Sequence, residues 1–109
     1  MITCIITYEI DPYKKDLFNT YAQNWGQAIP ECGADLVGYF SPHEGSTTRA
    51  YGIYNIESMA AYELYRQRLM AHPLGKENYE FAQKEKFILK EDRLFLKNAS
   101  LPHADFIAP

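Results

Sequence analysis

The sequence has few of the features that mark secreted or membrane-spanning proteins. Among its 109 residues there are only two cysteines, Cys4 and Cys32, and they do not have CxxC spacing. The start of the chain also lacks the basic segment of a secretory signal, so we expect reduced, buried thiols and a cytoplasmic protein. The apolar stretch within residues 1–8 is far shorter than the ~20 residues that a spanning helix needs, so no membrane span is predicted.

The net charge and the positions of the glycines argue against several further functional classes of protein. The net charge is −3 at pH 7, whereas nucleic-acid binding usually needs clustered Lys and Arg, so no nucleic-acid partner is predicted. The six glycines are scattered and form neither a Rossmann nor a P-loop fingerprint. No set of His and Cys residues has the spacing of a metal site, so neither a metal nor a cofactor is predicted.

What the chain does contain is a large share of apolar and aromatic residues. Hydrophobic residues make up 47% of the sequence and aromatic residues 15%, with nine tyrosines among them. This composition is typical of a folded domain and not of a disordered chain. We predict a single domain over residues 1–109, with a core of about residues 2–97 and a C-terminal tail at residues 98–109.

Strand and helix patterns alternate along the chain. Period-two alternation and β-branched residues predict strands at residues 2–10, 34–41, 47–55 and 87–97, the second and third joined by a turn-rich hairpin loop. A helical apolar stripe follows Asp11 and Pro12, which suit the N-cap and first helical position, and it ends near Gly33. A second helix is expected from Ser58 to His72, followed by a short helical piece at residues 75–83.

The order β-α-β-β-α-β predicts an α+β, ferredoxin-like fold. In that fold both helices cover one face of a four-stranded antiparallel sheet. The helix-free face would expose apolar side chains if Tyr39, Tyr51 and Ile53 or their neighbours lie on it. We therefore predict a homodimer in which two helix-free sheet faces close on each other as a dimeric α/β barrel.

Five segments of the chain resemble the NIPSNAP family, within the broader group of dimeric α/β barrels. They are YEIDP, LVGYF, PHEG, the helix from Tyr62 to Pro73, and EDRLFL, at residues 8–12, 36–40, 42–45, 62–73 and 91–96. Together they span most of residues 2–97. The resemblance implies ferredoxin-like subunits that pair into a barrel. It implies no defined biochemical role.

Small residues on the predicted sheet leave two interpretations open. Ala50 and Gly52 share one face of their strand, and Gly38 lies in the adjoining strand. They could let a helix pack closely on the sheet. Alternatively, they leave a cavity lined by Tyr8, Trp25 and Tyr54, which would suit an apolar or aromatic small molecule.

The charged residues within the predicted strands also allow two interpretations. Arg49 and Arg93 would be costly to bury alone, so salt bridges with Glu9 or Glu91, or across a dimer, are expected. The alternative is that an Arg fork binds an acidic group of a ligand.

The histidines carry weaker signals. His43 in the hairpin loop could act as a general base or metal ligand with Glu44, or lie at a solvated loop tip. His72 could cap a helix end, where an imidazolium interacts favourably with the helix dipole, or take part in catalysis.

Three functions from different classes fit these features. The first is a homodimeric protein that binds a small apolar or aromatic ligand between sheet and helices. The second is a cofactor-independent enzyme of monooxygenase, isomerase or decarboxylase type, with Tyr and His as proton donors and Arg stabilising an oxyanion. The third is a structural or protein-interaction module without a ligand. The candidate ligand-binding residues are Tyr8, Trp25, Tyr39, His43, Arg49, Tyr51, Tyr54 and Arg93.

Overall fold

A computed structural model describes residues 1–100 of the chain, which form one antiparallel sheet and three α-helices. In chain order the elements are β1 (Ile2–Ile10), the 3₁₀ turn η1 (Pro12–Lys14), α1 (Lys15–Glu31), β2 (Asp35–Phe40), β3 (Arg49–Ile56), α2 (Met59–Ala71), α3 (Pro73–Glu85) and β4 (Ile88–Leu96). Most of the predicted tail, residues 101–109, lies outside the described residues. None of the helices in residues 1–100 combines the length and apolar character that a membrane crossing requires.

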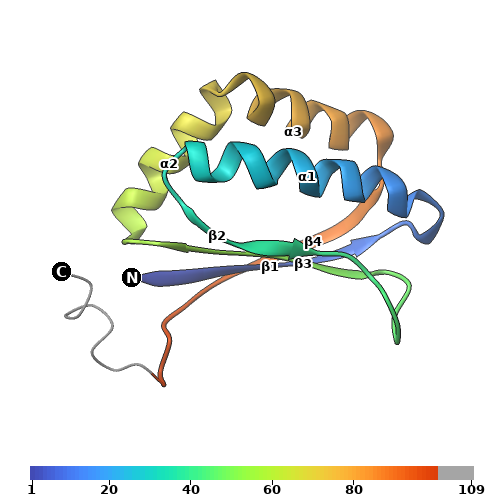
Figure 1. The fold of residues 1–109 in the computed structure, drawn as a ribbon, viewed down its shortest axis with the longest axis horizontal. Helices are drawn as coiled ribbons and strands as arrows, with labels where there is room; N and C mark the ends of the chain where they lie inside the picture. The colour runs from blue at the N-terminus through green and yellow to red at the C-terminus, as the bar shows by residue number, and fades with distance from the viewer. Residues whose placement is uncertain (101–109) are drawn as a thin grey trace.

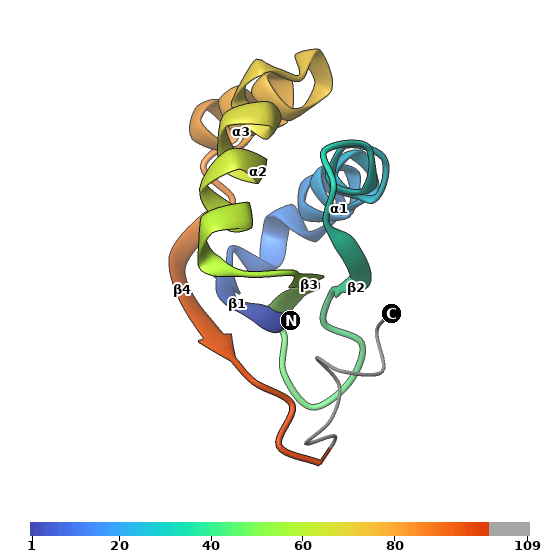
Figure 2. The ribbon, with the colours of Figure 1, turned by 90° about the vertical axis from the view of Figure 1, so that its left-hand side faces the viewer.

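The sheet has the strand order β2-β3-β1-β4, and each neighbouring pair is antiparallel. All three helices lie on the same face of this sheet (Figure 1). Viewed end-on, α1 lies on the side of β2, and α2 and α3 lie on the side of β4 (Figure 2). This confirms the predicted α+β, ferredoxin-like fold with helices on one face.

Capping residues explain where the helices begin. Asp11 accepts a hydrogen bond from the backbone N–H of Tyr13 and caps the 3₁₀ turn that leads into α1. Ser58 accepts one from Ala61 at 3.0 Å and caps α2, as the sequence predicts. The expected short helical piece at residues 75–83 is a full helix of 13 residues, α3, because Pro73 takes a favourable position in its first turn.

His72 lies between α2 and α3 and serves both helices. Its backbone ends α2, and its Nδ1 atom accepts a hydrogen bond from the N–H of Gly75, which caps α3. Its Nε2 atom lies 2.7 Å from Oε1 of Glu31. The ring therefore caps the beginning of α3 as an acceptor, and the backbone of His72 lies at the end of α2, as expected for a residue that caps a helix end.

The core lies between the helices and the buried face of the sheet. On β1 the fully buried side chains are those of Cys4, Ile6, Tyr8 and Ile10, which alternate with partly exposed ones. Cys32 is also buried, and neither thiol is in a disulfide. Burial raises the pKa of both thiols, which keeps them protonated.

A bulge in β2 changes which side chains of that strand face the helices. Leu36 pairs with Tyr54 and Gly38 pairs with Ile53, so Val37 is the extra residue. Gly38 has a φ of +157°, a backbone conformation that L side chains rarely adopt. Because the alternation shifts by one residue at this point, Tyr39 lies on the helix-covered face. Of the three residues considered for the helix-free face, Tyr51 and Ile53 lie there and Tyr39 does not.

Candidate functional site

A cleft of about 700 Å³ lies between the sheet and the helices. Every α-helix and every strand of the fold contributes to its lining. It has the size of many small-molecule sites, and its lining includes residues of α1, α2 and α3 as well as of the sheet. Figure 2 shows α1 on one side of the helix layer and α2 and α3 on the other.

Tyrosine is the commonest residue in this lining. Seven of the nine tyrosines in the chain contribute to it, whereas Tyr13 and Tyr51 do not. The seven are Tyr8, Tyr21, Tyr39, Tyr54, Tyr62, Tyr65 and Tyr79. The wall of the cleft is therefore apolar and aromatic, with hydroxyl groups set into it.

Tyr8 and Tyr39 form a hydrogen-bonded pair on the sheet side of the cleft. Their hydroxyl oxygens lie 3.0 Å apart, and the ring of Tyr21 meets both rings edge to face, at 6.2 Å between centroids. Burial raises the pKa of Tyr8 and of Tyr39 well above the ordinary value of a tyrosine. Both groups therefore remain neutral hydroxyls at physiological pH.

Trp25 on α1 contributes a buried N–H group without a good partner. Its Nε1 atom has no hydrogen bond of acceptable geometry within residues 1–100. It lies near the Tyr21 hydroxyl, whose pKa is raised by burial and lowered to a smaller extent by this neighbour. A buried donor without a hydrogen bond costs free energy.

Positive charge gathers in another part of the cleft, around Tyr62. Nη1 of Arg93 donates to the Tyr62 hydroxyl at 3.1 Å, and Nη1 of Arg66 reaches the same oxygen at 3.5 Å. Nη2 of Arg93 also pairs with Oε2 of Glu91 at 3.0 Å. Lys86, at the end of α3, lines the cleft as well.

The structure places five of the eight candidate residues in this cleft. These are Tyr8, Trp25, Tyr39, Tyr54 and Arg93. The other three lie elsewhere: His43 is exposed in the loop between β2 and β3, and Arg49 and Tyr51 are on the helix-free face. The expected salt bridges of Arg49 with Glu9 and of Arg93 with Glu91 are both present.

Several lining residues are not among the sequence candidates. They are mainly on the helices, with Tyr21 on α1, Tyr62, Tyr65 and Arg66 on α2, and Tyr79 on α3. Tyr62, Tyr65, Arg66 and Leu69 follow one another at helical spacing, and this pattern could have placed α2 over the sheet aromatics.

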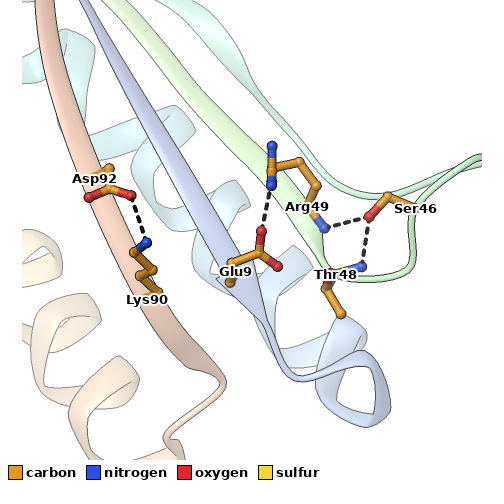
Figure 3. Close-up of polar contacts among 6 residues, drawn as sticks. All are labelled: Glu9, Ser46, Thr48, Arg49, Lys90 and Asp92. Atoms are coloured by element: carbon orange, nitrogen blue, oxygen red, sulfur yellow. Dashed lines mark hydrogen bonds and ion pairs between the residues drawn. The ribbon is translucent and has the colours of Figure 1, made fainter.

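The helix-free face combines apolar side chains with ion pairs. Ile5, Ile53 and Tyr51 are partly exposed on it, and Phe40, Leu94 and Leu96 are more exposed still. Near one end of the sheet, Arg49 Nε contacts Glu9 Oε1 at 2.8 Å and Lys90 Nζ contacts Asp92 Oδ2 at 3.6 Å (Figure 3). A hydrogen bond from Thr48, and a weaker effect of the hydrogen bond from Arg49, lower the pKa of Glu9, so its carboxylate remains charged.

No cluster of three or more potential metal ligands occurs within residues 1–100. The polar groups that line the cleft include tyrosine hydroxyls, the guanidinium groups near Tyr62, Lys86 and Glu91.

Comparisons with solved structures give the same fold. A NIPSNAP family protein of unknown function from Agrobacterium tumefaciens aligns with a TM-score of 0.76 at 22% identity, over 91% of this chain and 88% of the other. An uncharacterised NIPSNAP domain protein from Burkholderia xenovorans aligns with a TM-score of 0.73 at 21% identity, over 92% and 96%. A proposed antibiotic biosynthesis monooxygenase from Nitrosomonas europaea has a TM-score of 0.70 at 11% identity, over 91% and 99%.

At these identities the likeness shows the fold alone. No curated protein matches the chain. The NIPSNAP family model matches residues 3–102, which is nearly the whole sequence. The chain belongs to the NIPSNAP family, as its sequence segments suggest.

Proposed function

We propose that the protein binds a small, largely apolar and aromatic compound in the cleft between sheet and helices. The observation that carries this proposal is the lining of the cleft by seven tyrosines and the only tryptophan of the chain. If the aromatic residues served the core alone, their rings would fill the space between the layers. A cleft of about 700 Å³ remains beside them.

The polar groups of the cleft suit a ligand with acceptor atoms. Tyrosine hydroxyls can donate or accept, and the Trp25 N–H group can only donate. A planar aromatic compound with a carbonyl, hydroxyl or carboxyl oxygen would stack against the rings and accept hydrogen bonds from the tyrosine hydroxyls.

Trp25 also allows ligand binding in the cleft to be measured by fluorescence. Because it is the only tryptophan, the intrinsic fluorescence of the protein reports on the cleft. We expect a panel of two- and three-ring aromatic compounds to change this fluorescence with saturation and to raise the melting temperature. Tyr65→Ala, which enlarges the cleft, should change the affinities, and Tyr13→Ala, at a site that is 96% exposed, should not. Saturation by no compound of the panel would favour a module without a ligand.

A second candidate is a cofactor-independent enzyme acting on the same bound compound. The paired hydroxyls of Tyr8 and Tyr39 favour it, because neutral hydroxyls can donate hydrogen bonds to a substrate oxygen that gains negative charge during a reaction. The monooxygenase description of one protein of the same fold is consistent with this candidate. Turnover of a bound compound, lost in Tyr8→Phe with its affinity retained, would support catalysis. Binding of a compound without its turnover would contradict catalysis and support a ligand-binding function alone.

We also propose that two chains pair through their helix-free sheet faces. Leu94 is 57% exposed, Phe40 is 48% exposed, and both share this face with Ile5 and Ile53. Contiguous apolar side chains of this kind usually mark an interface. The ion pairs of Glu9 with Arg49 and of Lys90 with Asp92 then lie where a polar border is expected (Figure 3).

A further inference from the structure

Two guanidinium groups converge on a single oxygen atom in the cleft. Arg66 from α2 and Arg93 from β4 both reach the hydroxyl of Tyr62, at 3.5 and 3.1 Å. Like charges placed this close repel each other, although water at the exposed Arg66 screens part of the repulsion, and a negative charge beside them would compensate the rest.

The described residues supply only part of that compensation. Glu91 pairs with Arg93 at 3.0 Å, but neither Arg66 nor Lys86 has an ion pair with a carboxylate within residues 1–100. The charged residues lining the cleft are thus three cations and one anion, in a chain whose net charge is −3. The cleft has the opposite charge to the protein that contains it, which favours entry of an anion.

The hydroxyl of Tyr62 provides a further hydrogen-bond donor for an anion in the cleft. Its oxygen already accepts from two guanidinium nitrogens, so the group can offer a further partner only its proton. The structure shows no acceptor for this proton within residues 1–100. Carboxylate oxygens accept strongly from O–H and guanidinium N–H groups, and the planar fork of an Arg matches their geometry.

From these contacts, and resting on the proposed function, we infer that the ligand is an aromatic carboxylate. Its carboxylate would lie beside Tyr62, Arg66 and Arg93, and its ring system would lie against the tyrosines of the cleft. The aromatic lining alone would accept a neutral compound equally well. The preference for an anion therefore depends on the polar and charged residues of α2 and β4, and not on the aromatic lining.

The test compares an acid with its uncharged ester. We propose titration calorimetry with 2-naphthoate and methyl 2-naphthoate, and with a three-ring pair, anthracene-2-carboxylate and its methyl ester. The acids should bind at least ~10-fold more tightly than the esters, as expected for charge-assisted hydrogen bonds to guanidinium. Arg66→Met and Tyr62→Phe should each reduce affinity for the acids by about 5- to 20-fold and reduce affinity for the esters much less, because an ester carbonyl makes no charge-assisted hydrogen bond.

Lys84→Met is the matched control. Lys84 is exposed on α3 outside the cleft, so its replacement removes one positive charge without touching the proposed site. It should leave the affinity for the acids unchanged. Ester binding by each variant also shows that the variant is folded.

The outcomes separate the two proposals. Equal binding of acids and esters, unaffected by Arg66→Met, would overturn the carboxylate inference and retain an aromatic-binding cleft. An equal loss in Lys84→Met would likewise overturn it, since a general effect of net charge would then explain the preference. Binding of neither acids nor esters would overturn the proposed function and the inference with it.

Discussion

The ring of Tyr39 lies over Gly52, across the β2–β3 pair, in the space that a Cβ atom at position 52 would occupy. An ideal Cβ there would lie 2.5 Å from Cζ of Tyr39 and 2.9 Å from its hydroxyl oxygen. The absent side chain allows Tyr39 to cross β3 and reach Tyr8 on β1. The group that packs on Gly52 is therefore a tyrosine of the cleft wall, and not a helix as one of the two sequence interpretations expected.

Gly52→Ala should displace Tyr39 and destabilise the protein. Overpacking of this kind costs about 1–3 kcal/mol in the free energy of unfolding, which chemical denaturation would measure. The hydrogen bond between Tyr8 and Tyr39 should break as well, and ligand affinity should fall. Gly26→Ala is the control, because its Cβ meets no atom within 4 Å and helix propensity predicts a gain of about 0.5–1 kcal/mol. If Gly52→Ala were as stable as the unchanged protein, the packing of Tyr39 on Gly52 would be wrong.

The buried tyrosines should make the fold sensitive to alkali. Burial is the main cause that raises the pKa of Tyr8, Tyr39 and Tyr21 in the folded state above the usual value of about 10. Above pH ~10 the unfolded chain therefore releases protons that the folded chain retains, so the free energy of unfolding falls as the pH rises. Below that pH the contribution is fully present. Denaturation midpoints measured between pH 8 and 11.5 would show the decline.

The double variant Tyr8→Phe/Tyr39→Phe should reduce that pH dependence. Phenylalanine does not ionise, and removing both hydroxyls together leaves neither one buried without its partner. Tyr13→Phe, at an exposed position, removes one hydroxyl outside the core. A double variant with the same alkaline decline as Tyr13→Phe would show that this pair does not cause it.

His72 should contribute to stability through its cap on α3. His72→Ala removes the acceptor for the Gly75 N–H and should lower the free energy of unfolding by about 0.5–2 kcal/mol. His72→Asn should recover most of this loss, because an asparagine side chain accepts at the N-cap equally well. Glu31→Gln alters the contact of His72 Nε2 with Glu31 and leaves the cap at Nδ1 in place, so it shows how much that contact contributes to stability. Equal stability of the Ala and Asn variants, in thermal and urea denaturation, would contradict the capping role.

The sequence predicts the order of strands and helices, the sheet, and the two arginine salt bridges, since these depend on periodicity and on the cost of burying charge. It does not predict the bulge at Val37, because the extra residue interrupts the period-two pattern without a distinctive residue of its own. The sequence pattern therefore does not show on which face of the sheet Tyr39 lies. The charged part of the cleft was missed for another reason. Arg66 and Arg93 are 27 positions apart, and only the packing of α2 beside β4 brings them to one hydroxyl.

The last prediction concerns pairing through the helix-free face. Light scattering at low micromolar concentration should give twice the mass of the 109-residue chain, and Leu94→Asp should give a folded monomer. The side chain of Leu94 points away from the core, so the aspartate costs little in an isolated chain. In a dimer it would be buried without a partner, which is costly. Leu89→Asp is the matched control, since Leu89 is 65% exposed and lines the cleft on the other face. A monomeric unchanged protein, or a dimeric Leu94→Asp variant, would contradict this interface.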